Sequence, residues 1–291
     1  MLRRNVFFTV PALLTGCAAA SYESKISDWR KSYDLGLRSD KGPLYLVGRH
    51  TLQEGRTEIG SDTSSAVRLP DRAPKQVGSV EWRGHRLVFA PVAGVAVKLN
   101  GKPISRPATM RAGMPPNPRD KIEFGDFWIF ASILEDTCQL TVHDKQSPYL
   151  KRFSGAVWFP VDARYRVEAV FTPYPQPKEI RIPDTTGRAR PEKVPGYVTF
   201  KLNDETLRLD PVADSKGLFI MFKDRTSDRE TYGAGRFLEA ELPKDGKVVL
   251  DFNKAYNPYC AINPYSSCPI PPKQNALATR IEAGEMYRGE H

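Results

Sequence analysis

The sequence predicts a mainly β protein with two antiparallel β domains, the first a sandwich and the second a curled sheet or small barrel. Short alternating or apolar runs follow one another from about residue 42 to residue 252, and turn residues separate them. The 25 prolines and 21 glycines are spread along the chain, which favours many short strands. A chain of 291 residues is long for one hydrophobic core and is typical of two domains.

The first residues have the pattern of an export signal. A basic start, MLRR, precedes a short apolar stretch at 6–14, and Leu-Thr-Gly-Cys follows at 14–17. This resembles the signal of a bacterial lipoprotein, with residues 1–16 as the signal peptide and Cys17 as the lipidated residue. The alternative is a plain secretory signal that is cut after an alanine among residues 18–20.

The predicted anchor sets the expected location and partners. Apart from the signal, no run approaches the ~20 apolar residues of a membrane helix, so we expect attachment to the membrane through lipid on Cys17. Because Ala18 and not Asp follows the cysteine, we expect the outer membrane of the bacterial cell envelope where there is one. The formal charge of +9 is dispersed, with no basic run interleaved with aromatics, so we expect no nucleic-acid partner.

The anchor segment, residues 17–41, contains a predicted amphipathic helix at 21–37 that Ser21 would cap. Apolar residues spaced by three and four lie on one helix face: Ile26, Trp29, Tyr33 and Leu37. We expect this helix to pack on the first domain through Trp29. A spacer that lies on the membrane is the alternative.

Residues 42–143 have the spacing of a first β domain. Candidate strands lie at 43–48, 66–69, 78–82, 86–89, 95–99, 121–124 and 127–133. Asn100-Gly101 predicts a tight hairpin, because these residue types tolerate the positive φ of a type I′ turn. Several short strands at this spacing predict a β sandwich.

Four motifs of this domain occur in an order that resembles a forkhead-associated domain: Ile59-Gly60, Leu69-Pro70, Asn100-Gly101 and IEFGD at 122–126. The resemblance implies a β sandwich of a family that binds phosphothreonine. The chain departs from the family at the binding residues, with Ser61 in place of Arg and Gly-Ser-Val-Glu at 78–81 in place of Ser-x-x-His. An arginine fork recognises phosphate through paired hydrogen bonds, so we expect the fold without a phosphothreonine peptide as partner.

Residues 144–291 form the second predicted domain. Candidate strands lie at 157–160, 165–171, 178–182, 196–202, 205–209, 217–222, 235–240, 247–252 and 279–283. Hairpin turns at 202–205 and 244–246 predict an antiparallel meander, which would form a curled sheet or a small barrel.

Longer motifs of this domain are similar to those of a bacterial and archaeal family, the domain of unknown function 1684. They are WFPVD at 158–162, TYGAGR at 231–236, DFNKAYNPYC at 251–260, CPIPP at 268–272, Asn275 and AGE at 283–285. The similarity runs over about residues 145–286. It implies no activity, substrate or cofactor, because the family has none assigned.

The stretch 251–272 is the part of the chain least like a scaffold. Its prolines exclude a helix and a regular ladder strand, while its tyrosines and cysteines argue against disorder. Loops of this length are usually functional when they are ordered. We expect it to meet the segment 223–236 at one end of the sheet, where binding residues tend to be placed on a rigid scaffold.

These two segments supply the candidate binding site. The candidate ligand-binding residues are Arg225, Glu230, Thr231, Tyr232, Arg236, Asp251, Asn253, Tyr256, Asn257, Asn263 and Asn275. Arg225, Arg236 and Lys254 would suit a carboxylate or phosphate ligand. The alternative is a structural ion-pair network of Arg236, Asp251 and Glu230 that holds the loop.

Cys260 and Cys268 are predicted to form a disulfide, because disulfides are the usual state of paired cysteines outside the cytoplasm. Two buried thiols or a nucleophile are the alternatives. No histidine lies near this pair in sequence, and two cysteines alone are a weak metal signal, so we expect neither a metal site nor a cofactor.

The sequence thus favours an envelope lipoprotein with a non-enzymatic module that binds a small or polymeric ligand or a partner through the loops 223–236 and 251–275. A hydrolase or transferase that uses Asp251, Tyr256 or Cys260 is the first alternative. A purely structural protein is the second.

Overall fold

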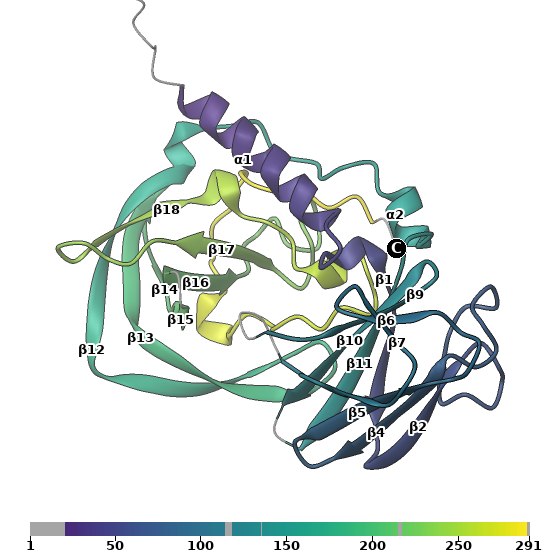
Figure 1. The fold of residues 1–291 in the computed structure, drawn as a ribbon. Helices are drawn as coiled ribbons and strands as arrows, with labels where there is room; N and C mark the ends of the chain where they lie inside the picture. Colours follow the sequence, from purple (N-terminus) through teal and green to yellow (C-terminus); the bar gives the residue numbers. More distant parts are fainter. Residues whose placement is uncertain (1–20, 114–117, 135, 215–216, 290–291) are drawn as a thin grey trace, which may run out of the picture.

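A computed structural model describes residues 21–113, 118–134, 136–214 and 217–289 (Figure 1). The predicted signal peptide and the predicted lipidation site, Cys17, lie outside these residues. The chain is mainly β, as predicted, with one long helix at the beginning of the described part. Within that part, no helix has the length and apolar character needed to cross a membrane.

The N-terminal domain is a sandwich of two sheets, which confirms the prediction. The first sheet has the order β1 (Leu46–Leu52), β11 (Thr137–Asp144), β10 (Phe127–Leu134), β9 (Lys121–Phe124), β6 (Val97–Leu99), β7 (Lys102–Ile104). The second has the order β3 (Val67–Arg68), β2 (Gly55–Gly60), β4 (Gly78–Arg83), β5 (Arg86–Pro91), β8 (Ala108–Met110). Neighbouring strands are antiparallel except β2 and β3, which are parallel.

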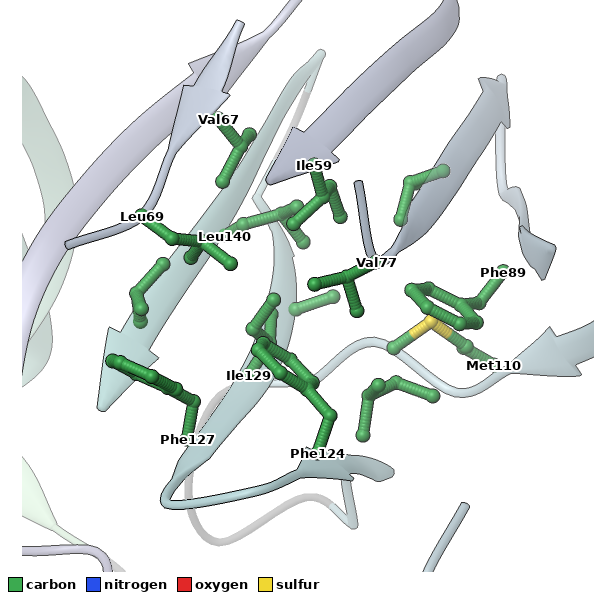
Figure 2. Packing of buried hydrophobic residues seen from close by; sticks show 14 of the residues in the cluster. Ile59, Val67, Leu69, Val77, Phe89, Met110, Phe124, Phe127, Ile129 and Leu140 are labelled. Atoms are coloured by element: carbon green, nitrogen blue, oxygen red, sulfur yellow. The ribbon is translucent and has the colours of Figure 1, made fainter. Parts of the chain in front are cut away.

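Alternating side chains of both sheets fill the space between them. Ile59 of β2, Phe89 of β5 and Ile129 of β10 are almost inaccessible to solvent and belong to one apolar cluster (Figure 2). The predicted hairpin at Asn100-Gly101 is present between β6 and β7, with φ of 50° and 78° at its two residues. Alternation and turn chemistry therefore suffice to specify this domain.

The C-terminal domain is a curled β structure and not a closed barrel. One sheet has the order β14 (Glu205–Leu209), β13 (Ala189–Leu202), β12 (Arg166–Pro183), β18 (Lys247–Asp251). The other has the order β15 (Val212–Asp214), β16 (Gly217–Phe222), β17 (Arg236–Ala240). A separate apolar cluster, which includes Val198, Ile220 and Leu250, lies between these strands.

The strand predicted at 279–283 is wrong. In this segment the Thr279 carbonyl accepts the backbone N–H of Arg225 and other backbone groups bond to side chains, so no strand ladder forms. Ile281 donates its N–H to the Asp224 carboxylate at 2.6 Å, and its carbonyl accepts from Arg236 at 2.9 Å.

Helix α1 (Tyr22–Leu37) has the predicted bounds and the predicted cap, because the Ser21 hydroxyl accepts the Ser24 N–H at 3.2 Å. The predicted docking on the first domain is wrong, since α1 lies across the C-terminal domain (Figure 1). The Trp29 ring meets the Trp158 ring edge-on at 5.7 Å, and the Tyr33 ring lies 5.4 Å from the Tyr256 ring. The apolar face was identified correctly, but periodicity does not say which surface covers it.

Short helical elements lie between the strands and in the segment that joins the two domains. They are η1 (Pro43–Tyr45), α2 (Pro148–Arg152), η2 (Ala163–Tyr165), η3 (Phe252–Lys254), η4 (Tyr259–Ala261) and η5 (Lys273–Asn275). A small apolar cluster of Leu37, Leu44 and Phe153 lies where the end of α1 meets η1 and the segment after α2.

Candidate functional site

Asparagine side chains hold the chain after β18 in an ordered but irregular path. After Asp251 this part of the chain forms only the short turns η3, η4 and η5 with loops between them. Asn253, Asn263 and Asn275 are fully buried there, and Asn257 is 4 % exposed. Buried amides are normally hydrogen-bonded, and the amide groups of these residues bond to the chain in place of a strand ladder; among the described residues only the Asn257 side-chain oxygen of the four has no partner.

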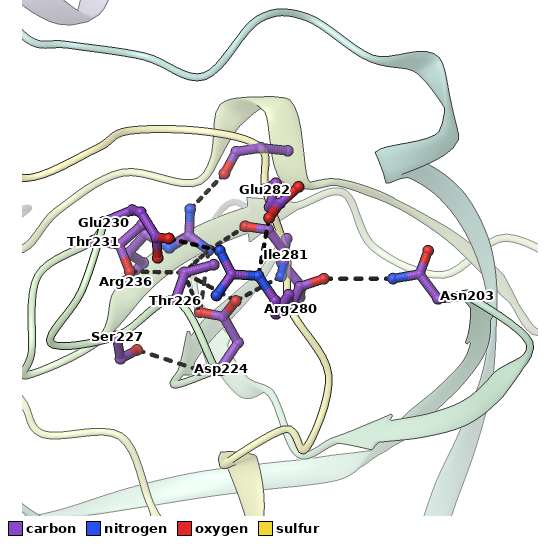
Figure 3. Close-up of polar contacts among 11 residues, drawn as sticks. Asn203, Asp224, Thr226, Ser227, Glu230, Thr231, Arg236, Arg280, Ile281 and Glu282 are labelled. Atoms are coloured by element: carbon purple, nitrogen blue, oxygen red, sulfur yellow. Dashed lines mark hydrogen bonds and ion pairs between the residues drawn. The ribbon is translucent and has the colours of Figure 1, made fainter.

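Arg236 is fully buried and binds groups of its own chain (Figure 3). Its guanidinium forms an ion pair with Asp224 at 3.2 Å and donates to the carbonyl oxygens of Ile281 and Ala283. Burial lowers the pKa of Arg236, and the Asp224 carboxylate opposes that change. The Thr226 hydroxyl, 2.9 Å from Asp224, completes the cluster. Arg236 therefore fastens the C-terminal segment beneath β17.

Other candidate binding residues in the segment 223–236 also form hydrogen bonds within the protein (Figure 3). Glu230 accepts from Arg280 at 2.7 Å, and this hydrogen bond lowers the pKa of Glu230. The buried Thr231 hydroxyl lies 2.9 Å from the Thr226 hydroxyl. The Arg225 side chain is exposed, and its backbone N–H donates a hydrogen bond to the C-terminal segment. The predicted network of Arg236, Asp251 and Glu230 has different partners, because Asp224 and Arg280 take the two ion pairs.

Asp251 and Asn253 form hydrogen bonds with Tyr22 at the beginning of α1. The Tyr22 hydroxyl donates to Asp251 at 2.7 Å, and the Asn253 amide donates to the Tyr22 hydroxyl at 3.0 Å. Asn253 also exchanges two hydrogen bonds with the Asp162 backbone at 2.8 and 2.9 Å. Burial and the bond to Asp251 raise the pKa of Tyr22 above its usual value.

Asn257 and Tyr256 face the middle of α1. The Asn257 amide group donates to the Met286 carbonyl at 3.0 Å, and the Asn257 N–H donates to the Glu285 carboxyl at 2.7 Å. The Tyr256 hydroxyl donates to Glu239 at 3.0 Å. Burial raises the pKa of Tyr256.

Glu285 was not among the candidates, although the sequence motif AGE at 283–285 contains it. Its carboxyl is 4 % exposed and accepts from the Tyr33 hydroxyl of α1 at 3.1 Å. Burial raises the pKa of Glu285 to about 8. Nothing in its spacing distinguishes it from the exposed Glu282, because its partners Tyr33 and Asn257 are distant in the sequence.

Asn263 links the two domains. Its amide donates to the carbonyl oxygens of Pro43 at 2.9 Å and Leu46 at 2.7 Å, and its carbonyl accepts the Tyr265 N–H at 2.8 Å. Asn263 therefore fixes the segment that enters the N-terminal domain.

Asn275 ties β16 to the end of β14, and its loss should destabilise the domain. It accepts the Asp210 N–H at 2.8 Å and donates to the carbonyls of Asp210 at 3.0 Å and Met221 at 2.8 Å. Asn275→Ala leaves these buried groups unpaired, so we expect a loss of about 2–4 kcal/mol in the free energy of unfolding, measured in urea. The matched control is the exposed neighbour Gln274, whose alanine variant should stay within about 0.5 kcal/mol.

The structure brings Cys260 and Cys268 together as free thiols, so the predicted disulfide is not formed in it. The Cys260 N–H donates to the Cys268 sulfur at 3.2 Å. Hydrogen bonds from Cys268 and Tyr232 lower the pKa of Cys260, while the bond to Cys260 and burial raise that of Cys268. The disulfide stays a prediction for exported protein.

Counting thiols by mass tests this prediction. In protein exported through its own signal and unfolded without reductant, we expect alkylation of buried Cys138 but not of Cys260 or Cys268. Reductant should add two adducts and lower stability by ~2–3 kcal/mol, because it opens a short cross-linked loop. If Cys260 and Cys268 react before reduction, the disulfide prediction is wrong.

A hollow of about 550 Å³ is present beside the segment 223–236; we call it the ligand hollow. Its lining residues come from the 228–234 turn and the C-terminal segment: Asp228, Arg229, Thr231, Tyr232, Gly233, Ala234, Tyr287, Arg288 and Gly289. The Tyr232 and Tyr287 rings meet edge-on at 4.9 Å. Of the predicted binding residues, only Thr231 and Tyr232 line this hollow.

The side chains that line the ligand hollow include two arginines and one carboxylate. Arg229 and Arg288 are exposed, and within the described residues neither forms a salt bridge. Asp228 is the one carboxylate among the lining residues, and it lies against Gly233, where an added Cβ would meet its oxygen. The C-terminal residues were missed because no sequence motif links 287–289 to the 228–234 turn.

Among the described residues, no group of three or more His, Cys, Asp or Glu could hold a metal ion. His143 stacks on Trp128 inside the N-terminal domain, and burial lowers its pKa to about 3, so it is neutral at physiological pH.

Comparisons with known proteins give a family and two solved structures. Residues 151–286 match a family described as a protein of unknown function, DUF1684. An uncharacterised protein of Haloarcula marismortui, solved by NMR, is 36% identical with a TM-score of 0.42 over 48% of this chain and 80% of that chain. The FHA structure of Rv0020c is 18% identical with a TM-score of 0.22 over 33% of this chain and 94% of that chain. No curated protein matches the chain.

Proposed function

Because the C-terminal part of this chain belongs to the DUF1684 family, which has no assigned function, we propose from the site itself that the domain binds a small anionic ligand without catalysis. The observation that carries this proposal is the ligand hollow, which two exposed arginines and a pair of tyrosine rings line together; among the described residues neither arginine forms a salt bridge. Guanidinium groups bind carboxylates and phosphates through paired hydrogen bonds, and tyrosine rings offer apolar contact to a ring or chain.

We further propose that the protein works as an exported lipoprotein of the bacterial cell envelope. The Leu-Thr-Gly-Cys pattern at 14–17 supports a lipid anchor on Cys17. We do not expect a phosphothreonine peptide at the N-terminal domain. Ser61, which stands where forkhead-associated domains have Arg, donates its hydroxyl to the Ala73 carbonyl at 2.8 Å.

Thermal shift in the presence of anions tests the binding proposal. We expect glucuronate, citrate or phosphate to raise the melting temperature, because a ligand that binds only the folded state stabilises it. The double variant Arg229→Ala/Arg288→Ala should abolish the shift. The control Arg86→Ala/Arg106→Ala removes two exposed arginines of the N-terminal domain and should keep it. A shift that survives in the first variant, or no shift with any anion, would support the structural alternative.

A further inference from the structure

The beginning of α1 covers a second cavity, of about 470 Å³, which we call the helix pocket. Helix α1 contributes Tyr22 and Lys25, and the C-terminal domain contributes Arg166, Asp251 and Lys254. These groups come from segments far apart in the sequence, and they meet where α1 docks on η2 and η3 (Figure 1).

The helix pocket carries an excess of positive charge. Three cations line it against one carboxylate, and Lys25 and Lys254 form no salt bridge within the described residues. Asp251 is already occupied by the Tyr22 hydroxyl at 2.7 Å, and the Arg166 guanidinium lies 4.0 Å away from it. Arg166 thus shares Asp251 in a long salt bridge, and Lys25 and Lys254 supply the excess of positive charge.

Two other cavities are closer to neutral, one of which shares Arg166, Asp251 and Lys254 with the helix pocket. The groove next to the helix pocket, between β17 and β18, is lined by four cations and four carboxylates. A cavity of the N-terminal domain has Arg72 opposite Asp126. Acidic groups near the helix pocket do not line it, since Asp162 is bound by Arg164 at 2.6 Å and Glu23 lies in the exposed first turn of α1. An anion is thus the ligand that fits this cavity best.

The position of the helix pocket identifies the source of that anion. Ser21 begins the described chain four residues after Cys17, and four extended residues span at most roughly 14 Å. A lipid on Cys17 would therefore hold the pocket at the membrane surface, where phosphate groups of phospholipids are the abundant anions.

We propose that Lys25, Arg166 and Lys254 bind the phosphate of an anionic phospholipid headgroup in the helix pocket. This inference rests on the proposed lipid anchor, which places the pocket near the membrane. Headgroup binding would fix the orientation of α1, and with it the direction in which the ligand hollow faces. Tyr33, near the opposite end of α1, contacts Glu285, so the hollow beside Tyr287 lies toward the end of α1 that is distant from the anchor.

Vesicle sedimentation tests the proposal with a chain that begins at residue 17 and carries Cys17→Ser, which keeps every described residue and removes the lipid. We expect it to bind vesicles that contain phosphatidylglycerol and not vesicles of phosphatidylcholine alone. Lys25→Glu/Lys254→Glu should weaken this binding at least tenfold. Lys98→Glu/Lys102→Glu makes the same charge change on exposed residues of the N-terminal domain and should weaken it less than twofold.

Other outcomes would overturn the proposal or assign the helix pocket to another ligand. Equal losses in both variants would show binding by overall charge, and absence of binding to phosphatidylglycerol would also overturn the proposal. A thermal shift with glycerol phosphate that Lys25→Glu/Lys254→Glu removes, without vesicle binding, would assign the pocket to a soluble phosphate ester instead. The lipid anchor is judged separately, by the mass of Cys17 in protein isolated from cells.

Discussion

Arg236→Met is expected to destabilise the C-terminal domain by about 3–5 kcal/mol. The substitution keeps much of the side-chain volume but leaves the Asp224 carboxylate, which is also buried, without its counter-charge. Removal of one partner of a buried ion pair has a large cost because the other charge stays desolvated. It also frees the carbonyl oxygens of Ile281 and Ala283. Urea unfolding, followed by tryptophan fluorescence, measures the change.

An exposed arginine provides the control for this prediction. Arg56 forms a salt bridge with Glu58 at 2.7 Å, and its side chain is 68 % exposed, so Arg56→Met should cost less than about 1 kcal/mol. The double variant Asp224→Leu/Arg236→Met should lose less stability than the sum of the two single variants, since neither charge remains. Similar small losses for Arg236→Met and Arg56→Met would contradict the structural role assigned to Arg236.

Glu285→Gln is expected to stabilise the protein at neutral pH and to flatten its stability profile. The pKa of Glu285 is about 8 in the folded protein, because burial disfavours the charged carboxylate. Because its pKa is raised, the protonated Glu285 side chain stabilises the folded protein fully below the ordinary glutamate pKa near 4.5. This contribution to the free energy of unfolding is lost as pH rises through about 8. At pH 7 the loss is about 3 kcal/mol. Glutamine keeps an acceptor for Tyr33 and Asn257 and has no charge to bury.

Unfolding in urea between pH 4 and pH 9 checks this prediction. The difference between Glu285→Gln and the unsubstituted protein should be smallest near pH 4 and should grow until about pH 8. Glu282→Gln, which changes an exposed carboxylate three residues earlier, should leave the profile parallel to that of the unsubstituted protein. A constant offset between the two Glu285 profiles would mean that the carboxyl is not the titrating group.

Local sequence signals identified most strands, the hairpin turns and the bounds of α1, but not the irregular path of 279–283. Alternation identified both domains, Asn100-Gly101 identified a hairpin, and Ser21 identified the cap of α1. These features depend on neighbours in sequence. The docking of α1 was predicted wrongly because it depends on rings of the C-terminal domain, Trp158 and Tyr256, which are distant in the chain.

The roles of the polar residues in the candidate site also depend on contacts between distant parts of the chain. Their unusual density in 223–236 and 251–275 marked an ordered region. Density alone does not tell a binding group from a buried structural one, and Arg236, Asn263 and Asn275 use their hydrogen bonds within the chain. Asp224 completes the cluster around Arg236 but was not selected, because a single acid beside basic residues is ordinary in a sequence.

The central claim is that the ligand hollow binds an anion, and native mass spectrometry of protein purified gently from its own host tests it most directly. We predict an added mass that is present in the unsubstituted chain and in Arg86→Ala/Arg106→Ala but absent from Arg229→Ala/Arg288→Ala. The size of that mass would give the ligand class. An apo mass in all three proteins, together with no thermal shift by any anion, would contradict the claim and leave the C-terminal domain as a structural module.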